Sequence, residues 1–497
     1  MENAKSKIRP QVIINLIRTI TITLLSFVSF PFAAQALGDT AMGQYSWANT
    51  FVYYFLIIGR LGIPMVAVRE CALVRDDKEQ LTRTVQSYFL LQLITTFISF
   101  LLLVTIVFSL GDHLMNADMR ALTMLLSVNF LVGVFSFEWV FIAYERHTYI
   151  AIRTIIITFI TSLLVILFVT NDKRLYVYAL IGCLTSFFTA IINFIFLKKD
   201  GFSFKPVGNY NLGKIIKPLL PVFLLTLIAT FYNQTDAFLL GFMDDSKRAV
   251  GSYSVAVRGI EIVITVLTSL SAVFIPHATK AYQNKDLEQF KSVNNYSLNI
   301  TFLLGLPAIG LMLVLAPNIV NFIVFDDVYW TAQSIQNAII AMCILASLMF
   351  TFSVSENIYQ QVLIPLKKEK YYLFAMLIGF IINVSLSLLL GLVAFKNNPL
   401  VGVAIATFTS DLVILIYMLI VSRKYVINNF FSLNNLKILL ATIFVSIVAY
   451  LLVPLLKLNP LVNVLITLLG AGVIYFCILL LLKENIIYSF IKGENAK

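Results

Sequence analysis

The sequence predicts an all-α integral membrane protein with about fourteen transmembrane helices. Of the 497 residues, 60% are hydrophobic and only 12% are charged, whereas about 25% are charged in soluble domains. The mean hydropathy is +0.91, and long apolar runs recur along the whole chain. A helix needs about 20 apolar residues to cross a bilayer, and it satisfies all its own backbone hydrogen bonds.

Charged breaks separate the apolar runs and define each predicted span in order. The first run ends in Ala34-Gln35-Ala36, which is similar to a signal-peptidase site, but it is long, contains Arg18 and precedes many further runs. We therefore expect the first run to be retained as a transmembrane helix. The predicted spans are 11–36, 43–68, 84–110, 119–142, 148–170, 175–197, 215–241, 250–276, 293–315, 331–362, 370–394, 400–421, 438–456 and 460–482.

The distribution of basic residues predicts the orientation of these spans. With the N-terminus inside, 26 of the 36 Lys and Arg residues fall on the cytoplasmic side, 7 fall outside and 3 lie within spans. Arg153 is one of the 26, because it is assigned to a cytoplasmic loop. This split follows the positive-inside rule. It predicts a multi-pass protein of the plasma membrane with both termini in the cytoplasm. Trp47, Trp139 and Trp330 fall near span ends, which predicts an aromatic belt.

The net charge of +11 does not indicate a nucleic-acid partner, because the basic residues punctuate apolar runs instead of forming one basic face. The four cysteines lie far apart, without the spacing of a metal site. We also find no nucleophile motif and no phosphate-binding loop. The sequence therefore predicts no catalytic residue, no metal and no cofactor.

An internal repeat predicts two related halves. Residues 43–48 (GQYSWA) open the second span and residues 251–256 (GSYSVA) open the eighth, with four of six positions identical. Each copy follows a Leu-Gly pair, Leu37-Gly38 or Leu240-Gly241, so the similarity includes an external turn. Because the repeat unit has six spans, both halves take the same orientation, as in alternating-access transporters whose substrate site lies between the halves.

This repeat predicts two six-helix halves followed by two C-terminal helices. The connection after the sixth span is basic and contains Gly201, Pro206 and Gly208, which is typical of a linker. The predicted division is an N-terminal six-helix bundle at 1–197, a cytoplasmic linker at 198–217, a C-terminal six-helix bundle at 218–425, and two further helices with a cytoplasmic tail at 426–497.

Four segments resemble the multidrug/oligosaccharidyl-lipid/polysaccharide exporter superfamily, and within it the Wzx-type flippases of the polysaccharide transporter family. In the fourth-helix segment, Ile142-Ala143 replaces a Gln-Gly-like pair that many members carry. The four segments occur in the family's order and are 137–153 (FEWVFIAYERHTYIAIR), 236–258 (DAFLLG followed by VGSYSVAVR), 360–370 (QQVLIPLKKEK) and 402–407 (GVAIAT).

The resemblance implies a flippase that moves an undecaprenyl-diphosphate-linked oligosaccharide from the inner to the outer leaflet without hydrolysing ATP. Its partners would be this lipid-linked oligosaccharide, membrane lipid around the polyprenyl tail, H⁺ or Na⁺ as a coupling ion, and glycan polymerase or ligase proteins. The glycan could belong to a capsule, an exopolysaccharide or a teichoic acid.

Ionisable residues inside the spans are the candidate functional residues, because such groups cost about 2.5–3.5 kcal/mol at the bilayer centre and usually face a protein interior or a cavity. Arg18, with Asn15 one turn earlier, and Arg60 offer donors to a diphosphate. Snorkelling to the interface or a structural ion pair are the alternatives. We predict Arg18, Arg60, Asn15 and Arg258 as substrate-binding residues.

Acidic residues inside the second half are candidates for ion coupling or gating. Arg258 and Glu261, three residues apart, could neutralise one another. Asp236, with Asn233 on the same face, could meet Arg258, and Asp411 lies in the middle of the twelfth span, as a coupling carboxylate or as a buried neutral acid. A further pair, Glu138 and Glu356, flanks the cytoplasmic ends of spans four and ten and is expected to orient basic residues.

Two alternatives to a flippase remain. A cation-coupled multidrug antiporter of the same fold should have an acidic cavity, whereas the intramembrane charges of the first half are arginines. A membrane polysaccharide polymerase or ligase would need an external domain or a convergent catalytic set, and none is recognisable in the sequence.

Overall fold

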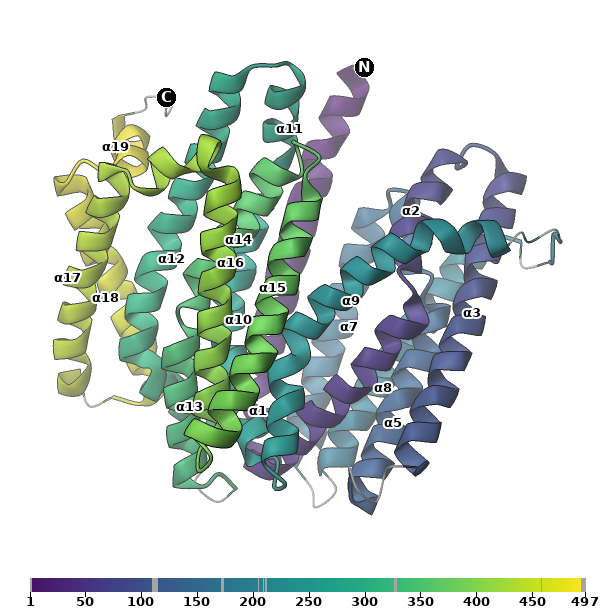
Figure 1. Cartoon of the computed structure of the whole chain (residues 1–497), viewed down its shortest axis with the longest axis horizontal. Coiled ribbons are helices and arrows are strands. Elements are labelled where there is room, and N and C mark those ends of the chain that lie inside the picture. Colours follow the sequence, from purple (N-terminus) through teal and green to yellow (C-terminus); the bar gives the residue numbers. More distant parts are fainter. Residues whose placement is uncertain are drawn as a thin grey trace. The chain divides into compact units, whose positions relative to one another are not determined.

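The computed structural model describes residues 2–109, 115–170, 174–203, 205–208, 210, 212–325, 329–456 and 458–492, with side chains described between residues 14 and 489. Phe204, Asn209 and Asn211 of the predicted linker, and tail residues 493–497, lie outside the described residues. The described chain contains these helices, in order (Figure 1): α1 (Glu2–Arg60), α2 (Ile63–Leu73), α3 (Lys78–Ser109), α5 (Ala117–Gly133), η1 (Val134–Ser136), α6 (Glu138–Ala143), α7 (His147–Phe168), α8 (Arg174–Lys199), α9 (Leu212–Met243), α10 (Arg248–Ala272), α11 (Ile275–Gln283), α12 (Leu287–Val324), α13 (Ala332–Leu345), α14 (Leu348–Ile358), η2 (Tyr359–Leu363), α15 (Glu369–Leu389), η3 (Leu390–Ala394), α16 (Pro399–Phe430), α17 (Leu433–Leu456), α18 (Pro460–Leu481) and α19 (Asn485–Lys492).

The all-α membrane fold is confirmed. Within the described residues, 13 helical stretches are long and apolar enough to cross a membrane. The first of them, Ile14–Leu73, is 60 residues long and breaks at Gly38, so that it provides two spans. The prediction of about fourteen transmembrane helices therefore agrees with the structure.

The break in α1 differs from the predicted external turn at residues 37–42. Only Gly38 leaves the helical conformation, with φ 76° and ψ 177°. This backbone conformation is open to glycine because it has no Cβ atom. The prediction of a six-residue turn is therefore wrong, and a single glycine separates two arms, the second of which spans about 33 Å.

Internal packing divides the chain into two compact units, residues 1–241 and 242–497. This division places α9 with the first unit, where its Phe238 and Phe231 contact rings of the second arm of α1. The predicted division at residues 198–217 was based on the sequence repeat, whereas the division at residue 241 is based on contacts between residues. The two six-helix halves therefore stay a prediction.

In the first unit, α1 packs on α3, α5, α7 and α8. In the second unit, α12 packs against α10, α13, α14 and α16, and the additional helices α17 and α18 pack on each other and on α12. Figure 1 shows α17 and α18 side by side. The two C-terminal helices are therefore part of the second unit's packing.

The three tryptophans are packed inside the protein. Trp47, Trp139 and Trp330 are 0%, 3% and 2% exposed. An aromatic belt would place their rings at the lipid–water interface, so that prediction is wrong for these residues. Their large apolar rings serve helix packing instead.

The predicted linker is attached to α3 by one side chain. The Nε2 of Gln86 donates hydrogen bonds to the carbonyl oxygens of Ser203 (3.0 Å) and Lys205 (2.8 Å). Its Oε1 accepts from the backbone N–H of Val207 (3.1 Å) and the hydroxyl of Tyr210 (2.7 Å). One glutamine therefore holds Ser203, Lys205, Val207 and Tyr210, which lie between α8 and α9.

We expect Gln86→Ala to speed chymotrypsin cleavage after Tyr210 several-fold in purified protein, because four hydrogen bonds of about 0.5–1.5 kcal/mol each would be lost. Cleavage is followed by gel electrophoresis over time. Gln80→Ala, at an exposed position on the same helix, is the matched control. Equal cleavage rates in both variants would show that Gln86 does not hold the linker.

Candidate functional site

A break in the fourth transmembrane segment positions a carboxylate within the first unit. The helix α5 ends at Gly133, η1 follows, and α6 starts at Glu138. Between them Phe137 takes the left-handed conformation, with φ 47° and ψ 19°, which is uncommon for a bulky residue. The break places Glu138 in the first turn of α6, where the helix dipole favours negative charge.

Two arginines from other helices meet this carboxylate. Arg18 of α1 places Nη1 3.7 Å from Glu138 Oε1, and Arg153 of α7 places Nη2 3.5 Å from the same oxygen. The Arg153 side chain is only 4% exposed, and its Nη1 donates to Asn193 Oδ1 at 2.6 Å. The expectation that Glu138 orients basic residues is therefore confirmed.

A cavity of about 440 Å³ lies beside the carboxylate and brings in a third arginine. Arg60 and Glu138 both line it, together with Gln92 and Ser136. A Cβ atom added at Gly133 would lie 4.0 Å from Nη2 of Arg60, so the guanidinium reaches the end of α5. Gln92 is 3% exposed, and its Oε1 has no hydrogen-bond partner among the described residues.

We call Arg18, Arg60, Arg153 and Glu138 the arginine cluster. It carries three guanidinium groups and one carboxylate, and therefore an excess of positive charge within an apolar bundle. The Nε atoms of Arg18 and Arg153 are buried without a partner in the described part of the chain. Guanidinium groups bind phosphate oxygens with charge-assisted, often bidentate hydrogen bonds. This chemistry suits a multivalent anion.

The structure thus brings together two predicted residues, Arg18 and Arg60, and adds two that the sequence did not identify as a site. Arg153 was assigned to a loop because it lies near the predicted start of its span. That assignment is wrong, since α7 begins at His147 and Arg153 is buried nearly two turns inside it. Glu138 and Arg153 both lie in the 137–153 segment that carries the family resemblance, and this was the available signal.

Asn15 is placed differently from the prediction. Its Nδ2 lies 3.3 Å from Nδ1 of His147, at the start of α7. The residue is on the same helix as Arg18, one turn away, but its recorded partner is a histidine and it does not line the cavity beside Glu138. A substrate-binding role for Asn15 stays a prediction.

In the second unit, Arg258 Nη1 and Glu261 Oε2 lie 2.7 Å apart on α10. The predicted neutralising pair is therefore confirmed. The two side chains are 36% and 47% exposed, so they are not sealed in the protein core. Substrate binding by Arg258 and gating by Glu261 both stay predictions.

Two acidic residues of the second unit are embedded in polar contacts. Asp411 is 1% exposed and accepts a hydrogen bond from the Thr351 hydroxyl. Glu356 accepts from Gln360 Nε2 (2.9 Å) and from the Tyr372 hydroxyl (2.8 Å). The expectation that Glu356 orients basic residues is wrong, because its recorded partners are an amide and a phenol.

The two residues of α9 that were predicted for ion coupling or gating differ in exposure. Asp236 is 5% exposed, whereas Asn233 is exposed. They are three positions apart on one helix, yet only the carboxylate is buried. Ion coupling at Asp236, and its predicted approach to Arg258, stay predictions.

Comparison with known proteins confirms the family resemblance. The family described as "Polysaccharide biosynthesis protein" matches residues 9–282, and the MatE family matches residues 221–389. A curated protein of Escherichia coli (strain K12) named "Putative O-antigen transporter" is 21% identical over 344 residues, which cover 68% of this chain and 78% of that protein.

Two solved structures show the same fold. The structure described as lipid II flippase MurJ, in an inward closed conformation, has a TM-score of 0.75 at 16% identity and covers 95% of this chain and 99% of its own. An inward-facing multidrug resistance transporter of the MATE family has a TM-score of 0.63 at 15% identity, covering 83% of this chain and 97% of its own. At these identities the likeness establishes the fold alone.

Proposed function

This chain belongs to the polysaccharide biosynthesis protein family, and we propose that it is a flippase for an undecaprenyl-diphosphate-linked oligosaccharide. The glycan would be a precursor of a capsule, an exopolysaccharide or a teichoic acid. It would move from the inner to the outer leaflet of the plasma membrane by alternating access, in a protein whose termini both face the cytoplasm.

The arginine cluster is the observation that carries this proposal. A lipid diphosphate presents several anionic oxygens, and three guanidinium groups around one carboxylate retain a positive excess to receive them. In an apolar bundle, water screens such charges weakly, so charge complementarity is effective there. An organic cation would be repelled by the same excess charge, which disfavours the antiporter alternative.

Each member of the cluster has a distinct task in this mechanism. Arg153 is held by Asn193 and Glu138 and fixes the carboxylate. Glu138 in turn orients Arg18. Arg60 lies on the cavity wall and would meet the diphosphate directly. The polyprenyl tail would stay in membrane lipid, and no residue performs a bond-breaking step.

Depletion of the protein in its native host tests the proposal. We expect completed glycan-lipid to accumulate in the inner leaflet, measured by assaying undecaprenyl-linked sugars and their accessibility from each side of the membrane. The sugar composition would identify the glycan. Normal glycan-lipid distribution with altered efflux of small organic cations would instead indicate a drug antiporter.

Asp411 is the proposed coupling carboxylate for H⁺ or Na⁺. We expect Asp411→Asn to lower export several-fold and to abolish its dependence on the ion gradient, because the amide oxygen can still accept from Thr351 while the charge is lost. Export is measured in vesicles with imposed gradients. Asp76→Asn, at an exposed position, is the control. If export by Asp411→Asn depends on the ion gradient as in wild type, Asp411 serves packing and not ion coupling.

A further inference from the structure

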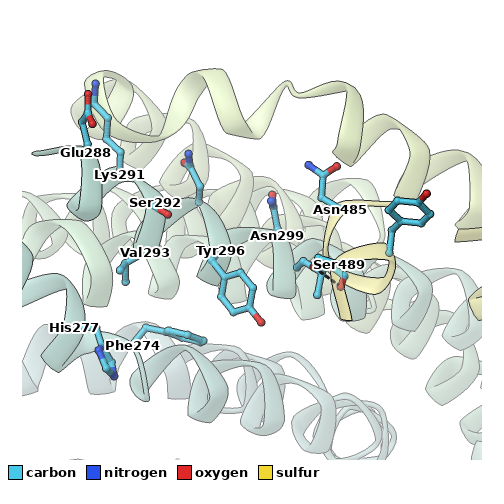
Figure 2. A pocket seen from close by; sticks show the side chains of 13 residues that line it. Phe274, His277, Glu288, Lys291, Ser292, Val293, Tyr296, Asn299, Asn485 and Ser489 are labelled. Carbon is cyan, nitrogen blue, oxygen red and sulfur yellow. Dashed lines mark hydrogen bonds between the residues drawn. The ribbon is translucent and has the colours of Figure 1, made fainter. Parts of the chain in front are cut away.

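A second polar groove lies in the second unit, at the start of α12. It has a volume of about 1480 Å³. Figure 2 shows Glu288, Lys291, Ser292 and Asn299 following one another along α12, with side chains of α19 beyond Asn299. The lining residues of the opposite wall, Phe274 and His277, come from the segment at the end of α10 and from α11.

A network of amide side chains holds the floor of this groove. The Nδ2 of Asn429 donates to Asn299 Oδ1 at 3.0 Å and to the carbonyl oxygen of Asn295 at 3.2 Å. The carbonyl of Asn429 accepts from Asn435 Nδ2 at 2.7 Å. Asn299 is 9% exposed, and these bonds use its oxygen, so that its amide N–H groups are available to a ligand.

The short helix α19 is fixed at the groove by a buried carboxylate. Glu484 is 0% exposed, and its Oε2 accepts from the backbone N–H of Ile487 at 2.9 Å. Its Oε1 accepts from Asn434 Nδ2 at 2.8 Å, and Asn434 Oδ1 accepts from the backbone N–H of Asn485 at 3.0 Å. The groove residues Asn485 and Ser489 therefore have a defined position.

The chemistry of the lining distinguishes this groove from the arginine cluster. Apart from His277, its ionisable residues are one lysine and one glutamate, Lys291 and Glu288, whose charges balance. The other polar groups are uncharged amides and hydroxyls, beside aromatic rings of Phe274, Tyr296 and Tyr488. Hydroxyl and amide groups match the donors and acceptors of a neutral polyol, and aromatic rings provide flat apolar faces.

We propose that this groove binds neutral sugar residues of the glycan on the cytoplasmic side, before the lipid-linked molecule is moved. This inference rests on the proposed flippase function. The positive-inside rule assigns the side, because Lys280 lies in the last turn of α11 and Lys285 lies between α11 and α12. The groove lies in the second unit, whereas the arginine cluster proposed for the diphosphate lies in the first.

Cysteine labelling in inside-out membrane vesicles tests the occupant. Ser489→Cys is made in a chain in which Cys343 and Cys477, which are not buried, are replaced by alanine. We expect a water-soluble maleimide to label residue 489 at least three-fold more slowly in vesicles that contain accumulated glycan-lipid than in vesicles from a host unable to make it. Lys285→Cys, outside the groove lining, should react equally in both.

Several results would overturn the groove proposal. Equal, rapid labelling of residue 489 in both vesicle types would show that the glycan does not occupy it. Slow labelling in both would indicate a phospholipid headgroup as the occupant. Labelling of both cysteines only in right-side-out vesicles would place the groove on the wrong side of the membrane.

Filling the groove provides a second, independent measurement. We expect Ser292→Trp to lower glycan export at least three-fold at equal amounts of folded protein, whereas Gln289→Trp, exposed on the same helix but outside the lining, should not. If Arg60→Ala stops export but Ser292→Trp and the labelling have no effect, the flippase function stands and the groove proposal fails. If depletion of the protein leaves the glycan-lipid unchanged, the flippase function itself fails.

Discussion

Replacing Arg60 with alanine is expected to lower export of the glycan-lipid at least ten-fold while the protein still inserts and folds. Arg60 lines the cavity beside Glu138 and would donate charge-assisted hydrogen bonds to a diphosphate. Hydrogen bonds to charged groups contribute about 1.5–3 kcal/mol, which corresponds to about 10–100-fold in binding. Export is measured as surface glycan per amount of folded protein in the depleted host.

Two further variants separate the role of charge from the role of shape. Arg60→Lys keeps the charge but loses the planar fork, so we expect export between that of wild type and Arg60→Ala. Arg69→Ala removes an arginine whose side chain is 80% exposed and should export normally. Normal surface glycan in Arg60→Ala would remove this residue from the binding site.

The other arginines of the cluster are weaker tests for a physical reason. Arg18→Ala should also impair export, but it removes a partner of Glu138 as well. Arg153 is nearly fully buried between Glu138 and Asn193. A hydrogen bond to a charged group contributes about 1.5–3 kcal/mol, so loss of the Arg153–Asn193 bond in Arg153→Ala would lower the amount of folded protein as well as transport.

The fold was predictable because bilayer crossing depends on local composition. Each apolar run can be identified from its own residues, and the predicted number of spans agrees with the structure. The break between the first two spans was predicted as well, but its length was not. A turn of six residues, 37–42, was expected, whereas Gly38 alone leaves the helical conformation, and composition does not give the backbone angles of a single residue.

The candidate site was only half predictable, since spacing along one helix does not reveal which residues of different helices meet. Arg18 and Arg60 were identified because a charge inside an apolar run is costly. Arg153 sits close to a predicted span end, where a charge costs little, and was missed. Only the packing of α7 against α1 and α6 shows that its guanidinium shares a carboxylate with Arg18.

The repeat motif also makes contacts between helices that the sequence did not reveal. It was used to infer two related halves, and in the first unit Trp47 of the first copy contacts residues that precede the second copy. Trp47 of the first copy stacks on Phe238, with ring centroids 6.2 Å apart, and its Nε1 donates to the Phe238 carbonyl oxygen at 3.1 Å. Gly241, which precedes the second copy, faces the same indole.

Gly241→Ala is therefore expected to reduce the amount of folded protein strongly. An added Cβ would lie 1.8 Å from Cδ1 and 2.1 Å from Nε1 of Trp47, and Trp47 is fully buried. Overpacking a filled core costs about 1–3 kcal/mol or more, because the rigid indole cannot move aside without losing its hydrogen bond. The measurement is the monodisperse fraction after solubilisation and the midpoint of thermal aggregation. Gly213→Ala, on the same helix with nothing within 4 Å of the added Cβ, is the control.

The reason for this loss can be tested by removing the indole. Trp47→Ala alone should destabilise the protein by about 3–5 kcal/mol, as expected for a buried tryptophan. In that background Gly241→Ala should add little or no further loss, because the space that its methyl group needs is then open. Equal effects of Gly241→Ala with and without the indole would contradict a steric cause. Non-additivity would instead establish that this glycine is required for the close approach of α9 to α1, and not for flexibility at a helix end.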